Sequence, residues 1–522
     1  MSDHTKYHPY LCQIYTHLSE DSSSQLTGSS NGQSSHAAHQ LNIAMQESRR
    51  RTQRTTQQLT PDATKRTYYP KMDEFIRWCD DKGYPLATRY QVDGDKLHFF
   101  LEESVSNTGI KKVIGRKRRP TNPKRRIIDD DSTTVEEEVE AYVISFSSIE
   151  QYVSAVVLLF HDQCRLNLNV PTNHPRIPDV KTLLKNERKK ETRRRKENYA
   201  DRVAGSILNG YSTTDELTKV VDYFLTKDRP EHYRNAVMFL ASHFGLMRGG
   251  NVCEIELADV HYIPLQGEGP NPEVECPCLI LLMDHGKTNQ FGKQEHASAI
   301  RCGHVEICLW MTLGIYFFHR WHISGEQFPD MTRPEEWYTI KLFKSGATND
   351  LKTAVSHDAH YKAFKKAFDD CHIKSTSITH AGRKSGAKMA DLGDAGASDI
   401  RRAGRWTNDS MEGSYLTNLP RRMLRVMASF DPNGKTFYLP RASVSPPSSL
   451  QRKVFPWVEE WQTKIDQGQG DQSVAADGFL KMLQILKVTF LQDSVMMIKR
   501  HPRLSIWSAP LFNDPEYLAY KS

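Results

Sequence analysis

Four residues in the C-terminal half of the chain, His380, Arg383, Trp406 and Tyr415, constrain its fold most strongly. His380 and Arg383 stand three positions apart, Trp406 follows Arg383 by 23 residues, and Tyr415 follows Trp406 by nine. The set combines an imidazole, a guanidinium, an indole N–H and a phenol. These groups act together only where they meet, so we expect the fold to bring the stretch 380–415 to one site.

Each of these residue types suits one task in breaking a phosphodiester without a metal ion. A nucleophile attacks phosphorus, cations hold the non-bridging oxygens, and an acid protonates the leaving oxygen. The planar fork of arginine matches two phosphate oxygens, and lysine can act as the acid because its pKa shifts on burial among cations. Upstream, Arg248 ends an apolar run and Lys287 stands in a Gly-containing turn, with Lys293 as the alternative lysine. Alone, each has an ordinary explanation as a cap, core or surface residue, and only the joint pattern predicts a site.

The composition indicates a soluble protein of 522 residues with polar extensions, long enough for about three domains. No run of about 18 apolar residues is present and the chain does not open on an apolar stretch, so we expect neither a membrane span nor a secretory signal. Nine scattered cysteines indicate free thiols in a reducing compartment. No standard zinc-site spacing is matched by the Cys and His residues of this region, which are Cys276, Cys278, His285, Cys302 and His304. We therefore expect no metal and no cofactor.

The N-terminal part divides into a tail and a helical domain. Residues 1–58 are rich in Ser, Gln, His and Thr with little apolar periodicity, which predicts a disordered tail. Residues 59–200 predict an all-helical domain that opens at Thr60-Pro61-Asp62 with a capping hydroxyl, its first helix ending at Gly83. Three apolar stripes with helical spacing follow: Tyr68, Met72, Phe75, Ile76 and Cys79; Leu97, Phe100, Leu101 and Val105; Ile149, Tyr152, Val153, Val156 and Phe160.

Charged segments interrupt and end this helical domain. An insertion over 107–141 carries two basic clusters, Arg116–Arg119 and Lys124–Arg126, before the acidic stretch Asp129–Glu140. Two basic clusters with a short spacer are typical of a nuclear import signal, or of an electrostatic arm for phosphate, and we expect a nuclear protein. A fourth helix, starting near Asp179, runs into a dense basic segment at 189–196.

Residues 201–435 predict a mixed domain. A buried helix around Ala236–Leu240 runs toward Gly249-Gly250, Leu279–Met283 is a strand, and Ala297–Arg301 could be the strand that returns. The aromatic segment Cys308–Trp321 reads as a core helix. A linker at 436–454 then leads to a helical segment at 455–522, whose amphipathic helix Phe479–Met497 would be core or a dimer face. The fold class predicted is mainly α with a small β-sheet.

The order of the site residues resembles the tyrosine recombinase (phage-integrase) family: Arg248, Lys287, His380-x-x-Arg383, Trp406 and Tyr415. Within that family, Gly286–Asn289, Gly404-Arg405-Trp406 and Ser414-Tyr415-Leu416 resemble the Crypton transposon recombinases of fungi and the related fungal centromere-binding kinetochore protein. Phe455-Pro456-Trp457 and Leu491-Gln492-Asp493 resemble the helical tail of that group. The resemblance covers roughly residues 60 to 500; Asn251 stands where many relatives carry an acid.

The resemblance implies cutting and rejoining of double-stranded DNA through a 3′-phosphotyrosine at Tyr415, with Lys287 as the acid and no metal. It implies a helical core-binding domain at 59–200, a catalytic domain at 201–435 and a homo-oligomer on DNA. It also implies that the basic segment contacts the DNA backbone, where phosphate contacts give salt-dependent affinity. The residues concerned are Lys189, Lys190, Arg193, Arg194, Arg195 and Lys196.

Two other interpretations stay open. The chain could be a domesticated DNA-binding protein that keeps the fold without catalysis and acts at the centromere or kinetochore or in transcription. It could also be a type IB topoisomerase, which shares the phosphotyrosine chemistry. All six catalytic positions hold chemically suitable residues, which favours activity. The two-domain layout and the fungal tail argue against a topoisomerase.

Overall fold

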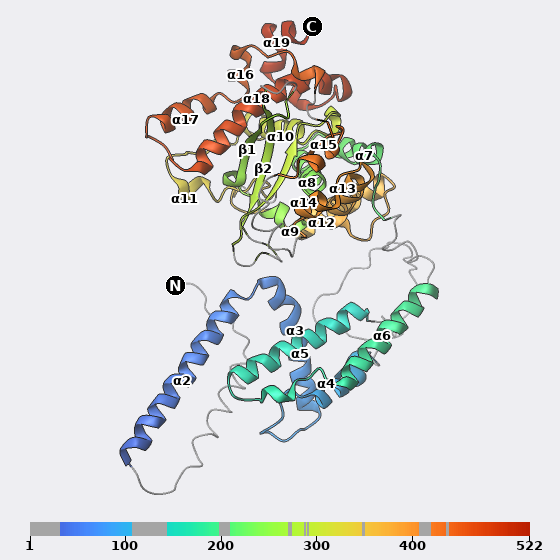
Figure 1. Ribbon diagram of the computed structural model, residues 1–522, viewed down its shortest axis with the longest axis vertical. Helices are drawn as coiled ribbons and strands as arrows, with labels where there is room; N and C mark the ends of the chain where they lie inside the picture. The colour runs from blue at the N-terminus through green and yellow to red at the C-terminus, as the bar shows by residue number, and fades with distance from the viewer. Residues whose placement is uncertain are drawn as a thin grey trace, which may run out of the picture. The chain divides into compact units, whose positions relative to one another are not determined.

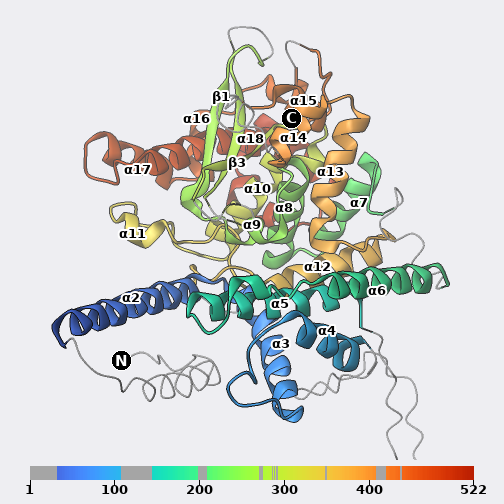
Figure 2. The same cartoon turned by 60° about the horizontal axis from the view of Figure 1, so that its bottom comes forward.

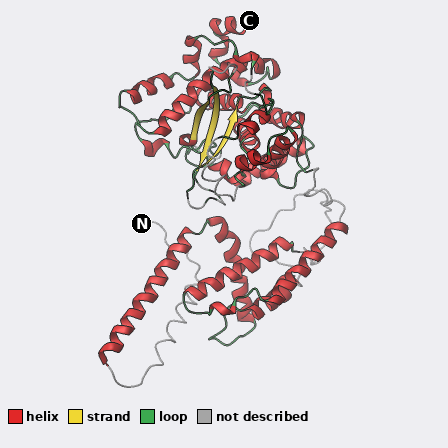
Figure 3. Ribbon diagram, in the orientation of Figure 1, coloured by secondary structure: helices red, strands yellow, loops and turns green. Residues whose placement is uncertain are grey.

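The computed structural model describes residues 32–106, 144–197, 209–269, 274–284, 286, 289, 292–346, 350–406, 419–434 and 438–522, without the side chains of 32–38. The chain divides into two compact units, Met1–Arg202 (unit 1) and Val203–Ser522 (unit 2), which follow one another along the colour scale of Figure 1. The described part is mainly helical with one small sheet (Figure 3), as the sequence predicts. Within those ranges, no helix has the length and apolar character needed to cross a membrane.

The regular elements of the described part of unit 1 are all helices, and the predicted apolar stripes form its core. Phe75, Leu97, Phe100, Val153 and Val156 are each at most 1% exposed, so the helical spacing seen in the sequence does mark the buried faces. The elements are α2 (Gly32–Leu59), α3 (Asp62–Asp81), α4 (Gly94–Phe100), the π-helix η2 (Leu101–Ser106), α5 (Phe146–Arg165), the short 3-10 turn η3 (Pro171–Asn173) and α6 (Pro178–Glu197).

The start of unit 1 differs from the sequence-based expectation in two ways. Residues 32–58, expected to be disordered, belong to helix α2. Its threonine hydroxyls donate to carbonyl oxygens four residues earlier, as from Thr56 to Thr52 at 2.9 Å. These side-chain hydrogen bonds therefore form within the helix and do not draw the backbone into a turn. The capping hydroxyl predicted at Thr60 is also wrong, because that hydroxyl donates back to the carbonyl of Thr56 and Pro61 precedes α3 without a side-chain cap. Residues 1–31 and the insertion at 107–141 lie outside the described residues.

Unit 2 surrounds a three-stranded antiparallel sheet with helices. The elements are α7 (Thr214–Leu225), α8 (Pro230–Phe244), α9 (Gly249–Glu254), η5 (Leu257–Asp259), β1 (Val260–Leu265), β2 (Cys276–Met283), β3 (Glu295–Ile300), η6 (Val305–Ile307), α10 (Leu309–Phe318), η7 (His319–Ile323), α11 (Pro334–Trp337), α12 (His357–Asp370), η8 (Ile378–His380), α13 (Ala381–Leu392), α14 (Ala397–Gly404), α15 (Arg421–Met427), η10 (Pro440–Ala442), α16 (Ser448–Val454), α17 (Trp457–Asp466), α18 (Val474–Arg500), η11 (Ser505–Ser508), η12 (Pro510–Asn513) and α19 (Pro515–Lys521).

The sheet has the strand order β1-β2-β3, with β2 in the centre. Leu281 of β2 pairs with Val260 on one side and Ala297 on the other, so the predicted strand and its predicted return are both confirmed. The aromatic helix is confirmed as core: every residue of α10 is buried, and α10 packs against α8 and α18. The core of unit 2 thus lies between these helices and the sheet.

The C-terminal segment is part of this same core. In α18, Leu480, Leu483, Leu486 and Leu491 are 0% exposed, and the helix packs against α10, α17 and β1. A dimer contact through these side chains, one of the two roles predicted, is therefore wrong, because elements of the same unit already cover them. The expected linker at 436–454 is also shorter than predicted, since α16 begins at Ser448 and buries its apolar side chains.

Candidate active site

Two glycines let the helix that carries Arg383 approach α8 closely. A methyl group on Gly382 would lie 2.8 Å from Cβ of Ser242, and one on Gly386 would lie 2.4 Å from the carbonyl oxygen of His243. Neither position can hold a larger side chain without moving a helix. As a result α13 runs directly beside α8 (Figure 2). From α13, Arg383 reaches the turn that follows α8, where it donates to the carbonyl of Leu246.

Arg383 is held by two backbone carbonyls and one aromatic ring. The side chain is 5% exposed, its Nη1 donates to the carbonyl of Leu246 at 2.5 Å, and its Nη2 donates to the carbonyl of Gly404. The ring of Trp406 lies over the guanidinium, 4.4 Å from carbon to ring centre, and Trp406 is itself 41% exposed. Gly404 permits this stack, since a methyl group there would overlap the indole at 2.2 Å. Each Nη carries a second N–H and Nε a fifth, so donors remain for a phosphate.

Arg248 and His380 meet at the same place. Arg248 precedes α9, and the next residue packs so tightly that a methyl group on Gly249 would lie 2.9 Å from Cβ of Thr379, the neighbour of His380. The structure therefore brings Arg248, His380, Arg383 and Trp406 together, although the first and third are 135 positions apart.

The electrostatics of this region reflect crowded positive charge. Partial desolvation lowers the pKa of the exposed His380 imidazole, and nearby charges, Arg383 and Arg248 among them, lower it further. Burial lowers the pKa of Arg383 to about 9, with the charges of Arg405 and Arg248 acting in the same direction. An anion placed among these groups would relieve the repulsion, which is the condition for a phosphate-binding site.

Arg405 belongs to the site, although it was not among the residues predicted. Its side chain is 8% exposed and donates from Nη1 to the carbonyl of His296 at 2.9 Å and from Nη2 to that of Leu246 at 2.7 Å. Burial lowers its pKa to about 10, against the opposing charge of Glu295. Its signal in the sequence was its place in the motif Gly404-Arg405-Trp406, which does not distinguish a buried arginine from a surface one.

Lys287 lies outside the described residues, but its flanks are placed. Gly286 and Asn289 donate their amide hydrogens to each other's carbonyls, at 2.9 and 3.0 Å, after the end of β2. A methyl group on Gly286 would lie 2.8 Å from Nδ2 of Asn251 in α9, so this turn begins next to the helix that Arg248 precedes. The alternative lysine, Lys293, donates its amide to the side chain of Asn289 at 2.9 Å.

Tyr415 also lies outside the described residues, between Trp406 and α15. The helix that follows is anchored through Glu268, which is 2% exposed and accepts from Nε of Arg425 at 2.7 Å. Arg421 donates to the carbonyl of Gln266 at 2.7 Å. The segment with the predicted nucleophile is thus preceded by the site tryptophan and followed by an anchored helix.

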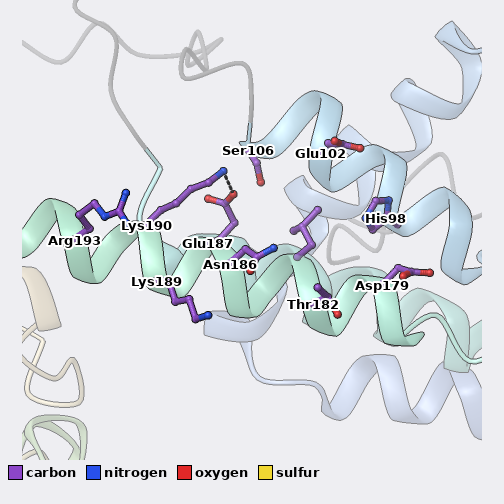
Figure 4. Close-up of a pocket in the computed structure, with 11 residues that line it drawn as sticks. His98, Glu102, Ser106, Asp179, Thr182, Asn186, Glu187, Lys189, Lys190 and Arg193 are labelled. Atoms are coloured by element: carbon purple, nitrogen blue, oxygen red, sulfur yellow. Dashed lines mark hydrogen bonds and ion pairs between the residues drawn. The ribbon is translucent and has the colours of Figure 1, made fainter.

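The basic segment of unit 1 lies at the exposed end of α6. Ion pairs within the helix partly neutralise it: Lys190 with Glu187 at 2.7 Å, and Arg194 and Arg195 with Glu191 at 2.8 and 3.0 Å. Such exposed pairs are weak and exchange readily for a phosphate. A hollow of about 480 Å³ lies between this part of α6 and the α4–η2 stretch, and it is lined by Lys189, Lys190 and Arg193 but also by Glu102 and Glu187. Figure 4 shows these side chains on the two facing stretches.

The cysteines considered for zinc lie in apolar surroundings. Cys276 and Cys278 belong to β2 and pack in a small cluster with Ile280 and Ile300. Burial raises the pKa of the Cys278 thiol to about 12, which disfavours the thiolate that a metal requires. Within the described ranges, no three His, Cys, Asp or Glu residues are grouped closely enough to hold a metal ion, and His285 lies outside them.

Comparison with known families decides the relationship. The family described as "Centromere DNA-binding protein complex CBF3 subunit, domain 2" matches residues 166–518. The chain belongs to this family. The predicted kinship with a centromere-binding protein is thereby confirmed. No curated protein sequence matches the chain.

Solved structures to which the chain is similar include recombinase complexes. A "Flpe-Holliday Junction Complex" matches with a TM-score of 0.34 and 14% identity over 67% of this chain and 79% of that one. An "FLP Recombinase-Holliday Junction Complex I" gives 0.33 and 12% over 64% and 78%. The XerH site-specific recombinase bound to palindromic difH substrate gives 0.35 and 14% over 66% and 77%.

Proposed function

We propose that the chain binds double-stranded DNA and acts as a site-specific tyrosine recombinase or integrase of a mobile element. One observation carries the proposal: Arg248, His380, Arg383 and Trp406 meet beside a third arginine, Arg405, with their positive charges crowded together. A phosphodiester supplies the anion that this arrangement favours.

In the proposed reaction the phenol oxygen of Tyr415 attacks the phosphorus, forming a 3′-phosphotyrosine while the bond to the 5′ oxygen breaks. Arg248 and Arg383 hold the non-bridging oxygens, and Lys287 donates a proton to the leaving 5′ oxygen. His380, neutral at pH 7 because its pKa is lowered, can accept the phenol proton. Rejoining reverses these steps with the 5′ hydroxyl of the recipient strand, so atoms and charges balance without a metal.

The test uses a duplex selected from a random pool by the wild-type protein and then nicked, so that cleavage releases a short fragment and traps the adduct. Wild-type protein should form a covalent protein–DNA adduct. Tyr415→Phe should form none while binding DNA with nearly unchanged affinity, and the control Tyr438→Phe, at a tyrosine 60% exposed, should behave as wild type. An adduct that persists in Tyr415→Phe would refute the assignment.

The same substrate assigns the acid when its bridging 5′ oxygen is replaced by sulfur, a leaving group that needs no proton. Lys287→Ala should cleave normal DNA slowly and the sulfur substrate at nearly the wild-type rate. Rescue of Lys293→Ala instead would transfer the role to that lysine.

A second candidate function, binding of centromere-type DNA without catalysis, is favoured by the family to which the chain belongs. Arg383 already donates two hydrogen bonds to backbone carbonyls, an arrangement that is compatible with such a binding role. Tight binding of the selected duplex with no adduct from the wild-type protein would decide for this candidate.

Location and assembly complete the proposal. We place the protein in the nucleus, as DNA of a centromere or a eukaryotic mobile element requires, with import through Arg116–Arg119 and Lys124–Arg126.

Strand exchange between two duplexes needs four cleavages and each chain offers a single Tyr415, so several copies must assemble on the DNA. In unit 1, the basic end of α6 would contact the DNA backbone. Sedimentation with the selected duplex should show more than one chain per DNA, and strict one-to-one complexes would favour the second candidate.

A further inference from the structure

Leu246 has a backbone conformation that leucine rarely adopts. Its φ angle is +46°, in the left-handed region, and its side chain is 0% exposed. A positive φ at a bulky residue is strained and persists only where the surroundings enforce it. Leu246 stands two residues before Arg248, so this strained turn sets the direction in which the predicted phosphate ligand leaves α8.

Arg405 is the residue that ties this turn down most extensively. Its Nη2 donates to the carbonyl of Leu246 at 2.7 Å, and both Nη atoms lie 3.2 Å from the carbonyl oxygen of Gly245. Nη1 also donates to His296 in β3 at 2.9 Å. One guanidinium therefore joins the end of α8, the sheet and the turn that leads into Trp406.

Arg405 itself occupies the left-handed region, with φ of +55°, at the end of α14. This conformation turns its side chain inward while the next residue, Trp406, lies over Arg383. Two predicted site residues, Arg248 and Trp406, thus depend on backbone that Arg405 holds.

We propose that Arg405 is a positioning residue of the phosphate site, acting through Arg248 and Trp406 and not by contact with DNA. The inference rests on the proposed function and extends it to a residue outside the predicted set. A lysine could not replace it, because a single ammonium cannot reach carbonyls of α8 and β3 in the directions that the planar fork spans. Its nearest ion pair, with Glu295 at 3.9 Å, is too long to explain its burial as a structural salt bridge.

The experiment compares Arg405→Lys with Arg401→Lys, a change of the same kind at an exposed arginine of the same helix. Arg405→Lys should speed amide hydrogen exchange at 245–249 at least about tenfold and lower the single-turnover rate of adduct formation about 100-fold, the usual cost of an ångström-scale misplacement. The dissociation constant for the duplex should change less than threefold. Arg401→Lys should leave exchange and rate unchanged. Should Arg405→Lys not fold, Arg405→Met takes its place, because it keeps the length without a buried charge.

Coupling to Arg248 separates positioning from a general structural effect. In an Arg248→Ala background, Arg405→Lys should cause little further loss of rate, because the two changes act on one interaction. Fully additive losses, or unchanged exchange at 245–249, would overturn the proposal. If the wild-type protein forms no adduct, the proposed catalysis fails, but amide hydrogen exchange still tests the positioning role of Arg405. Bound duplex should then slow exchange at 245–249 in the wild type and not in Arg405→Lys. Equal protection in both proteins would overturn the proposal.

Discussion

Unit 2 contains two arginine clusters at similar depth that differ in their surroundings. In the tail cluster, Arg301 and Arg441 share the carboxylate of Asp493, which is 0% exposed. In the site cluster, which comprises Arg248, Arg383 and Arg405, the two buried guanidinium groups of Arg383 and Arg405 face backbone carbonyls and each other's charge.

The pKa values of Arg441 and Arg383 shift in opposite directions. Burial is the largest single effect on Arg441 and lowers its pKa, but the charge and hydrogen bond of Asp493, together with the nearby thiols of Cys308 and Cys302, outweigh it and the pKa is raised. For Arg383 burial acts in the same way without a compensating partner of that strength, and the pKa falls to about 9. The tail cluster is therefore complete by itself, whereas the site cluster carries positive charge that a bound anion would compensate.

Two other buried carboxylates in unit 2 follow the pattern of the tail cluster. Glu268 pairs with Arg421 and Arg425, and Glu326, 7% exposed at its side chain, accepts from Arg320 at 2.6 Å. Arg234, 7% exposed, is an exception, because it donates to the carbonyl of Lys344 and to the side chain of Asn235. The candidate site differs from Arg234 in that the charges of neighbouring arginines lower the pKa of Arg383 further.

The largest effect is expected from removing the carboxylate of the tail cluster. Asp493→Ala leaves two buried guanidinium groups uncompensated, which should lower the free energy of unfolding by about 3–5 kcal/mol. Denaturant titration measures it, while the adduct rate of the folded fraction should be unchanged. A loss below about 1 kcal/mol would remove the distinction between the clusters.

The reverse outcome is expected at the site. Arg383→Ala should lower the rate of adduct formation about 10²–10³-fold, as loss of one preorganised donor does. Its stability should change by no more than about 1 kcal/mol, because removing an uncompensated buried charge offsets the lost carbonyl contacts. Single-turnover cleavage and denaturant titration are measured on the same preparation, and a large stability loss with normal cleavage would make Arg383 a structural residue.

Buried histidines near the site extend the comparison to pH. Burial lowers the pKa of His243 to about 3 and that of His360 to about 4, whereas both titrate near 6.5 in an unfolded chain. Between these values the unfolded chain binds more protons, so stability is lost as pH falls from about 6.5 toward 4, by up to about 1.4 kcal/mol per unit for each histidine. His360→Asn should reduce that slope by one histidine's share, and the exposed control His372→Asn should not. An unchanged slope in His360→Asn would show that the buried imidazole does not titrate as argued.

The sequence predicted those elements whose signal is local. Helical stripes such as Phe75 with Cys79, and the strand at Leu279–Met283, have periodicities that survive packing because one face must be buried. The sequence did not predict burial that depends on a partner far away in the chain. The helix around Leu486 reads as amphipathic, but it is surrounded by α10, α17 and β1, and its polar Asp493 is buried because Arg301 and Arg441 come from elsewhere in the chain.

The site shows the same limit. Spacing singled out the candidate site residues, but no pattern shows that the carbonyl of Leu246 would accept from two guanidinium groups. That contact depends on Gly382 and Gly386, which set the distance between α13 and α8, and on a left-handed Leu246. Arg405 was therefore visible only as the neighbour of Trp406.

The salt dependence of DNA binding tests whether the site cluster binds a phosphate, and it does not require catalysis. The logarithm of the binding constant is measured against the logarithm of salt concentration for wild type, Arg383→Gln and Arg441→Gln. Loss of one phosphate contact reduces the magnitude of the slope by about 0.9. That reduction is expected for Arg383→Gln, and the wild-type slope is expected for Arg441→Gln. Identical slopes for all three proteins, or a reduction at Arg441 alone, would exclude a phosphate contact by Arg383.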